Sequence, residues 1–224
     1  MGVSFLDWIW PKKCVNCGRV GKYVCESCKV GLWEEEQICP VCARLSRYGL
    51  KHKYCHKPYS LDGLTCLWEY EGIAQKIIKK AKYKYFYDML GELIDSPEGE
   101  EYFYLQKFLE NNPVVVPVSL HERRYRERGF NQAEVIGKLV AGRWSLAVAD
   151  LLKRTKNTGH QTGRTREERL IAVKNAFQLK TKDQLPKAVL LVDDVWTTGA
   201  TMNECCRVLK QNGVKRVWGL VLAR

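Results

Sequence analysis

Eight of the ten cysteines lie between residues 14 and 66, and most of them form pairs separated by two residues. Two thiolates at this spacing can hold one side of a zinc ion, and two such pairs complete a tetrahedral site. Because four protein ligands leave no open coordination position, sites of this kind are structural rather than catalytic. The pairs are Cys14 with Cys17, Cys25 with Cys28, and Cys39 with Cys42.

The third cysteine pair has a less regular partner. His52 and Cys55 repeat the two-residue spacing, and a neutral imidazole is a competent zinc ligand. His56 and Cys66 compete for the same position. Pairing in sequence order is the simplest arrangement, and a cross-braced arrangement stays open. The expected cofactor is one or two structural zinc ions, with the second held by Cys39, Cys42, His52 and Cys55.

A second group of polar residues follows a hydrophobic run near the C-terminus. Residues 187–195 predict a strand that ends in Asp193 and Asp194, and a short turn leads into a helix. Ligands of open α/β sheets bind beyond such strand ends. The turn can bind an anion, and the acids can accept from ribose hydroxyls or help to hold Mg²⁺. The residues of this turn are Thr197, Thr198, Gly199, Ala200 and Thr201. A phosphorylated sugar is the predicted ligand.

The elements that must position these groups divide the chain into two regions. Residues 11–66 are too short to build a large core unaided and need a metal staple. Residues 70–224 show alternating helix and strand patterns, which predict an α/β domain with a parallel sheet flanked by helices. Helices are expected at 73–94, 96–111, 131–144 and 201–213, strands at 113–118, 187–195 and 214–223, and a mobile loop within 153–180.

Composition excludes two classes of protein. With 46% hydrophobic and 28% charged residues the chain is not disordered as a whole, and it has no apolar run of the roughly 20 residues that span a membrane. The N-terminal segment is a poor signal peptide, so a cytoplasmic location is expected. A net charge of +12 favours anionic partners.

The basic residues are densest between residues 123 and 128. Arg123 and Arg124 follow Val118 and Ser119 closely enough to bind a pyrophosphate, since a guanidinium binds phosphate in bidentate fashion. The alternatives are a solvated basic face and a track for single-stranded DNA, in which aromatic rings stack on bases. The candidate DNA contacts are Arg124, Arg126, Arg128, Lys79 and Lys82, with Tyr83, Tyr85, Phe86 and Tyr125 as stacking platforms.

The stretch from Ala188 to Thr201 resembles the signature of the type I phosphoribosyltransferases, whose donor is phosphoribosyl pyrophosphate (PRPP). The resemblance implies that Asp193 and Asp194 contact the ribose hydroxyls as the catalytic acids. It also implies that residues 197–201 cradle the 5′-phosphate and that Mg²⁺ accompanies the donor. The protein would need no nucleophile of its own, because it orients the donor and neutralises the leaving group.

Nearly the whole chain resembles the ComF family of competence proteins. The similarity rests on the cysteine pairs, on residues 117–119 and 128–132, and on a segment around Arg169. It implies a PRPP-binding protein that acts in DNA uptake with other uptake proteins. The alternative is a metabolic phosphoribosyltransferase acting on an unidentified nitrogenous acceptor. The sequence departs from the family pattern at His52, Ala172 and Trp196. The residue directly after Met1 is not a cysteine, so the N-terminal glutaminase nucleophile is absent.

Overall fold

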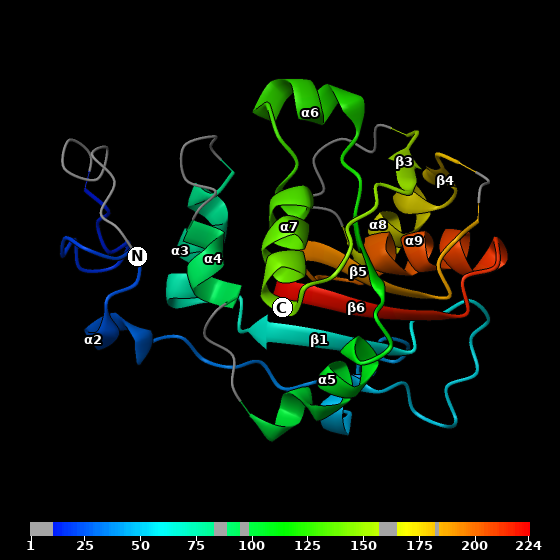
Figure 1. Cartoon of the computed structure of the whole chain (residues 1–224), viewed down its shortest axis with the longest axis horizontal. Helices are drawn as coiled ribbons and strands as arrows, with labels where there is room; N and C mark the ends of the chain where they lie inside the picture. Colours follow the sequence, from blue (N-terminus) through cyan, green and yellow to red (C-terminus); the bar gives the residue numbers. More distant parts are fainter. Residues whose placement is uncertain (1–10, 83–88, 95–98, 157–164, 182–183) are drawn as a thin grey trace.

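A four-stranded parallel sheet forms the centre of the chain in the computed structural model (Figure 1). The structure describes residues 11–82, 89–94, 99–156, 165–181 and 184–224. The strand order is β1-β6-β5-β2, so the last two strands of the sequence lie between the first two. The strands are β1 (Gly63–Trp68), β2 (Val114–Pro117), β5 (Ala188–Val195) and β6 (Arg216–Ala223).

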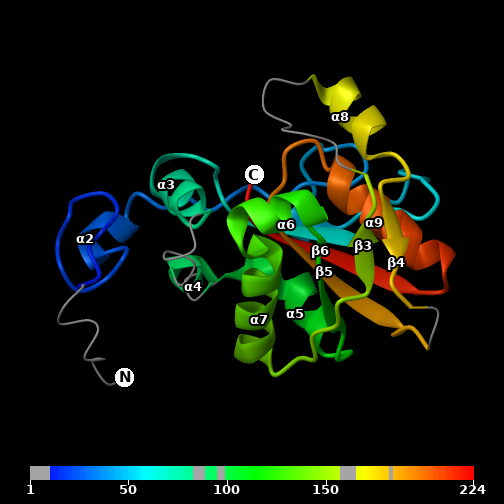
Figure 2. The ribbon, with the colours of Figure 1, turned by 90° about the horizontal axis from the view of Figure 1, so that it is seen from above.

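The central strand β5 is apolar on both faces, as a buried parallel strand must be. Leu190 and Val192 belong to one hydrophobic cluster, and Val189 and Leu191 belong to the other. Figure 2 shows the corresponding helices on opposite sides of the sheet. The first cluster is covered by α3 (Gly72–Lys80), α4 (Met89–Ile94), α5 (Phe103–Leu109) and α7 (Gln132–Trp144).

The second face is covered by a helix and a hairpin. The helix α9 (Ala200–Gln211) contributes Met202, Cys205, Cys206 and Leu209 to the second cluster. The two cysteines are fully buried there and have no part in a metal site among the described residues. The antiparallel hairpin of β3 (Leu152–Arg154) and β4 (Phe177–Leu179) lies beside α8 (Arg166–Val173), and α6 (Glu122–Arg128) lies above the end of the sheet (Figure 1).

The α/β prediction is confirmed, with corrections to individual elements. The helix predicted at 73–94 is two helices, α3 and α4, whose connection at 83–88 lies outside the described residues. In the region predicted as a helix at 96–111, a short 3-10 turn (Glu100–Tyr102) precedes α5. The stretch 153–180 contains β3, α8 and β4, and the part of the predicted loop at 157–164 lies outside the described residues.

The cysteine-rich region is joined to the sheet rather than separated from it. β1 begins at Gly63, so the last residues of the predicted module 11–66 belong to the sheet. Along the open edge of β1, the buried side chain of Gln37 accepts from the amide of Cys66 at 3.1 Å and donates to its carbonyl at 2.8 Å. This amide satisfies backbone groups that an edge strand otherwise leaves open. The module also includes α2 (Glu26–Lys29) and a 3-10 turn at Arg47–Gly49.

Candidate functional site

The first cysteine cluster brings both early pairs together. The Sγ atoms of Cys14, Cys17, Cys25 and Cys28 all lie within 4.8 Å of one another, which suits a tetrahedral thiolate site. A turn closed by the amide of Gly18 on the carbonyl of Cys14 presents the first pair, and α2 presents the second. The pKa of Cys14 falls to about 6, because hydrogen bonds from nearby backbone amides outweigh the effect of burial. A thiol held as a thiolate is ready to bind metal.

The second cluster settles which residue completes the other site. The possible ligand atoms of Cys39, Cys42, His52 and Cys55 lie within 4.8 Å of one another. Nδ1 of His52 points at Sγ of Cys42 at 3.3 Å, while its Nε2 lies 3.0 Å from the carbonyl oxygen of Leu45. A hydrogen bond from Nε2–H to that carbonyl leaves Nδ1 free to bind metal, the arrangement that orients most ligating histidines.

The two competing ligands are thereby excluded. Cys66 is fully buried in β1, and burial raises the pKa of its thiol far above the usual range. His56 does not join the cluster. The pairs follow sequence order and are not cross-braced, so the structure brings each predicted ligand set together in one cluster. The residues fit two zinc ions whose role is to fold the module, because no ligand position is left for a substrate.

The predicted acids and turn line a cavity at the C-terminal end of β5. Its volume is about 330 Å³, and Asp193 and Asp194 face it together with Thr197 and Thr201. A small hollow directly beside it is lined by the rest of the turn, Thr198, Gly199 and Ala200. Parallel strands place their carboxyl ends at one edge of the sheet, and ligands of open α/β sheets bind there.

Asp193 is the member of the acid pair whose pKa is shifted. Burial, and then the charge of Asp194, raise its pKa well above the ordinary value for an aspartate. Its Oδ1 accepts a hydrogen bond from the amide of Asp194 at 2.9 Å, which opposes that rise. Strongly shifted acids in a cavity are typical of functional sites. Such an acid is well placed to receive a hydroxyl or a cation that restores its charge.

The turn between β5 and α9 requires glycine. Gly199 has a φ of +71°, and a Cβ there would lie 2.2 Å from the ring of Trp196. Trp196 is buried, and its ring packs against Gly199 and lines the small hollow with the turn. Oγ1 of Thr198 accepts from the amide of Ala200 at 3.3 Å.

A second loop completes the wall of the cavity. Val118 and Ser119 follow β2, and the amide of Val118 donates to the carbonyl of Val192 in β5 at 2.9 Å. The buried side chain of Asn131 donates to the carbonyl of Val118 at 3.0 Å and also caps the N-terminus of α7. Asn131 is thus a positioning residue that the sequence analysis noted only as part of a motif.

Cations from three elements line the same cavity. Lys82, Arg124 and Arg128 were candidates from the sequence, and all three line it. Arg154 lines it too, although the sequence placed it only beside a loop. It lies in β3 with 7% of its surface exposed, over the ring of Phe177 at 5.4 Å. Burial lowers the pKa of Arg154, and so does the charge of Arg124. An anion bound in the cavity would favour the charged guanidinium and so oppose both of these effects on the pKa.

The other basic candidates lie elsewhere. Arg123 pairs with Glu127 at 3.1 Å and does not line the cavity, which removes it from the group around the acids. Lys79 donates to Gln75 at 2.7 Å on the exposed face of α3. Arg126 lines a different cavity. Tyr83, Tyr85 and Phe86 lie outside the described residues.

Two family models match the chain. The double zinc ribbon domain matches residues 5–57, which include all eight clustered ligands. The phosphoribosyl transferase domain matches residues 131–224, which include β5 and the turn that follows it. Both matches agree with the module order predicted from the sequence.

Several characterised proteins are similar to parts of the chain. Competence protein F of Haemophilus influenzae is 40% identical over 117 residues, which are 49% of this chain and 50% of that protein. Competence protein ComFC of Streptococcus pneumoniae is 34% identical over 145 residues, 64% of this chain and 61% of that protein. The DNA utilization protein YhgH of Escherichia coli K12 is 36% identical over 110 residues, 47% and 48% of the two chains. The chain therefore spans about half to three fifths of the length of these relatives.

Proposed function

Since the chain is a ComF-type competence protein homologue with a double zinc ribbon and a phosphoribosyltransferase domain, we propose that it binds PRPP with Mg²⁺ at the acid pair and the adjoining turn. The observation that carries this proposal is the junction of β5 and α9. There, two carboxylates line one cavity together with Thr197 and Thr201, and the rest of the turn lines the small hollow beside it. A polyol fits the acids, a phosphate fits the turn, and PRPP carries both groups.

Each part of the cavity has a separate task in this proposal. Thr197, Thr198 and the amides of residues 199–201 hold the 5′-phosphate. Asp193 and Asp194 accept from the ribose hydroxyls, and Mg²⁺ bound with the donor would help to neutralise the pyrophosphate. Arg124, Arg128 and Arg154 supply positive charge beside Ser119, where the pyrophosphate would lie. Fixed cations of this kind favour the departure of an anionic leaving group.

The role of the zinc sites is structural in the same proposal. The four ligands of each cluster are all side chains of this chain, so each site would hold a loop rather than a substrate. Glu92 in α4 accepts from the amides of Tyr23 and Val24 at 2.9 and 2.5 Å, which ties the first cluster to the helices beside the sheet. A folded first cluster therefore helps to hold α4 in place.

The biological setting proposed is the cytoplasmic handling of DNA taken up from outside. The relatives are named competence or DNA utilization proteins, and the basic residues favour a nucleic-acid partner. No helix among the described residues is long and apolar enough to cross a membrane. The alternative is a metabolic phosphoribosyltransferase with a nitrogenous acceptor; the acid pair and the turn favour ligand binding in either case.

Calorimetric titration of PRPP with Mg²⁺ tests the ligand. The parent should bind, and Asp193→Asn with Asp194→Asn should lose at least tenfold in affinity, because a hydrogen bond to a charged group is worth about 1.5–3 kcal/mol. Thr198→Ala should lose less, since backbone amides still hold the phosphate. Glu110→Gln, which changes an exposed acid at the end of α5, serves as the control. Equal affinity in the double variant and the parent would place the site elsewhere.

A pyrophosphate-release assay separates the two roles. An enzyme should release pyrophosphate from PRPP when a nitrogenous acceptor is added, and the double variant should not. Binding without release across a panel of amines and nucleobases would favour a binding role in DNA uptake over a metabolic one.

A further inference from the structure

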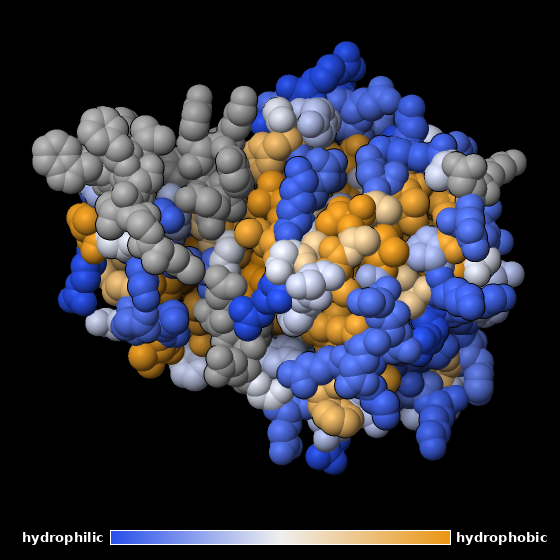
Figure 3. Space-filling model, in the orientation of Figure 1, coloured by the Kyte–Doolittle hydropathy of each residue, from blue (hydrophilic) through white to orange (hydrophobic). Residues whose placement is uncertain are grey.

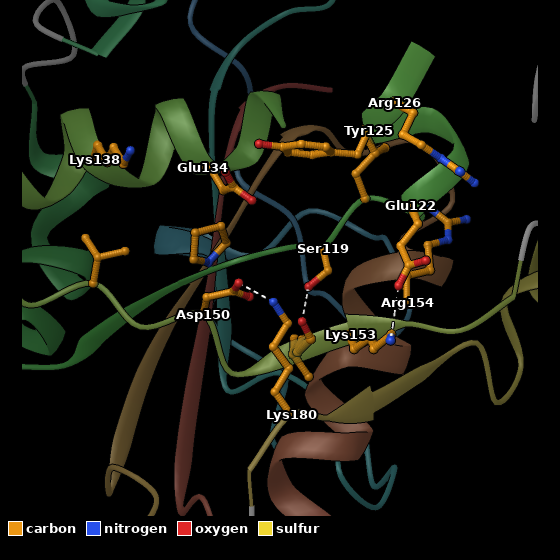
Figure 4. Close-up of a pocket in the computed structure, with 14 residues that line it drawn as sticks. Ser119, Glu122, Tyr125, Arg126, Glu134, Lys138, Asp150, Lys153, Arg154 and Lys180 are labelled. Atoms are coloured by element: carbon orange, nitrogen blue, oxygen red, sulfur yellow. Dashed lines mark hydrogen bonds and ion pairs between the residues drawn. The ribbon is translucent and has the colours of Figure 1, made fainter. Parts of the chain in front are cut away.

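A second and larger cavity lies on the other side of the loop that follows β2. Its volume is about 890 Å³, within the range of pockets that hold small ligands. Figure 4 shows its walls: α6 above, α7 on one side, and the strand β3 below. Ser119, Leu120 and Arg154 line both this cavity and the one around the acid pair. The two cavities are therefore neighbours that share a wall.

Some of the charges in the second cavity are already paired. Lys153 binds Glu122 at 3.1 Å, and Lys180 pairs with Asp150. Both pairs close the lower edge of the cavity in Figure 4. Ser119 donates to the carbonyl of Leu152 at 2.5 Å and fixes the shared wall.

Two further cations in the cavity are uncommitted. Among the residues that the structure describes, neither Arg126 nor Lys138 has an ion pair or a side-chain hydrogen bond. Within the same described ranges, Glu134, which lies between them in Figure 4, receives one long contact of 3.4 Å from the side-chain amide of Asn131. The cavity thus offers one cation at each end for an anion and one carboxylate for a donor.

The remaining lining is apolar and includes an aromatic ring. Tyr125 extends across the top of the cavity in Figure 4 and is 45% exposed. Pro117, Val148 and Leu152 add apolar surface, and Val148 is 43% exposed. Figure 3 shows apolar surface between α7 and the β3–β4 hairpin, surrounded by hydrophilic side chains. A half-exposed ring above apolar floor residues suits a planar heterocycle.

We propose that this second cavity binds a nucleotide, apart from PRPP and from the acid pair. The base would stack on Tyr125 and donate to Glu134, and the phosphate would bind Lys138, one helical turn from Glu134 on α7. A ligand with a planar base, N–H donors and an anionic group uses all three kinds of lining at once. Because Ser119 and Arg154 face both cavities, the nucleotide and PRPP should alter each other's affinity by the same factor.

The test uses adenosine 5′-monophosphate (AMP) as the probe, titrated into the full chain by calorimetry. Lys138→Glu and Tyr125→Leu should each weaken AMP binding about tenfold or more while PRPP binding stays within a factor of two of the parent. Both side chains are exposed, so both variants should fold, and thermal unfolding checks this. Lys107→Glu, an exposed cation of α5 outside both cavities, is the charge-matched control and should bind AMP as the parent does.

A nucleotide also carries a ribose 5′-phosphate, so binding at the first cavity must be distinguished. Asp193→Asn with Asp194→Asn should lose PRPP but keep AMP, which separates failure of this proposal from failure of the proposed function. Three results would overturn the second site: loss of AMP binding in that double variant, unchanged AMP binding in both cavity variants, or simple displacement of AMP by PRPP. Lys138-dependent binding of a short oligonucleotide without any binding of AMP would also overturn it, in favour of a strand.

Discussion

The negative charge of Asp193 serves ligand binding but lowers the stability of the fold. Burial raises its pKa, because the folded chain solvates the carboxylate less well than the unfolded chain does. The unfolded aspartate loses its proton near its usual pKa of about 3.9, before the folded one does. The free energy of unfolding should therefore fall as the pH rises between those two pKa values.

Asp193→Asn tests this argument, because it removes the charge and keeps an oxygen that can accept from the amide of Asp194. The variant should be more stable than the parent at pH 8, and the difference should shrink as the pH falls to about 3, below the usual aspartate pKa, where both the folded and the unfolded parent carry the proton. Thermal unfolding at the two pH values measures it. A variant that is less stable at pH 8 would mean that the pairing of Asp193 with nearby cations outweighs burial.

His52 carries a prediction about metal content. His52→Ala should reduce bound zinc from two equivalents to about one, because three cysteine ligands without the imidazole no longer close the second site. His56→Ala is the matched control, since His56 is a nearby histidine outside the cluster. Metal analysis of protein purified without chelators gives the counts. Equal zinc in both variants would show that another group supplies the fourth ligand.

At the scale of elements, Gln37 joins the cysteine-rich region to strand β1 of the central sheet. Gln37→Ala should leave the backbone amide and carbonyl of Cys66 without their partner in a buried strand. An unsatisfied buried polar group costs about 1–3 kcal/mol, so the free energy of unfolding should fall by that amount and the variant should unfold at a lower denaturant concentration. Gln106→Ala, on the exposed side of α5, is the control. Equal stability of the two variants would mean that water replaces the Gln37 amide.

The sequence predicted the elements that follow one regular pattern and missed those that do not. Residues 187–195 and 131–144 were recognisable because apolar runs and helical spacing are long there. β1 was missed because Cys66 led to the assignment of that segment to the metal-binding module. In the structure, β1 pairs with β6. α6 was missed because a helix with charges all around shows no apolar face. The site was predicted where it is local in sequence, as in the turn, and missed where it is assembled in space, as with Arg154.

Across the whole molecule, part of the positive charge lies in two cavities that open beside each other. Arg124 and Arg128 face the acid pair, whereas Arg126, on the same helix α6, faces the larger cavity. The basic cluster, for which a track for single-stranded DNA was one of three alternatives, is therefore divided between two neighbouring cavities. A single strand that contacts both would cross the loop at Ser119 and Leu120.

This division leads to a prediction about single-stranded DNA. A short oligonucleotide of mixed sequence should bind weakly, and the logarithm of its affinity should fall linearly with the logarithm of the salt concentration, because each neutralised phosphate releases counterions. Arg124→Glu with Arg126→Glu should weaken binding for all sequences alike and flatten the slope by roughly 0.7 for each phosphate that is no longer neutralised. Lys107→Glu removes the same kind of charge outside both cavities and should change the slope much less. Fluorescence anisotropy across a salt series measures both quantities. Affinity that does not respond to salt, or an equal effect of the control, would show that the strand binds through other groups than these arginines.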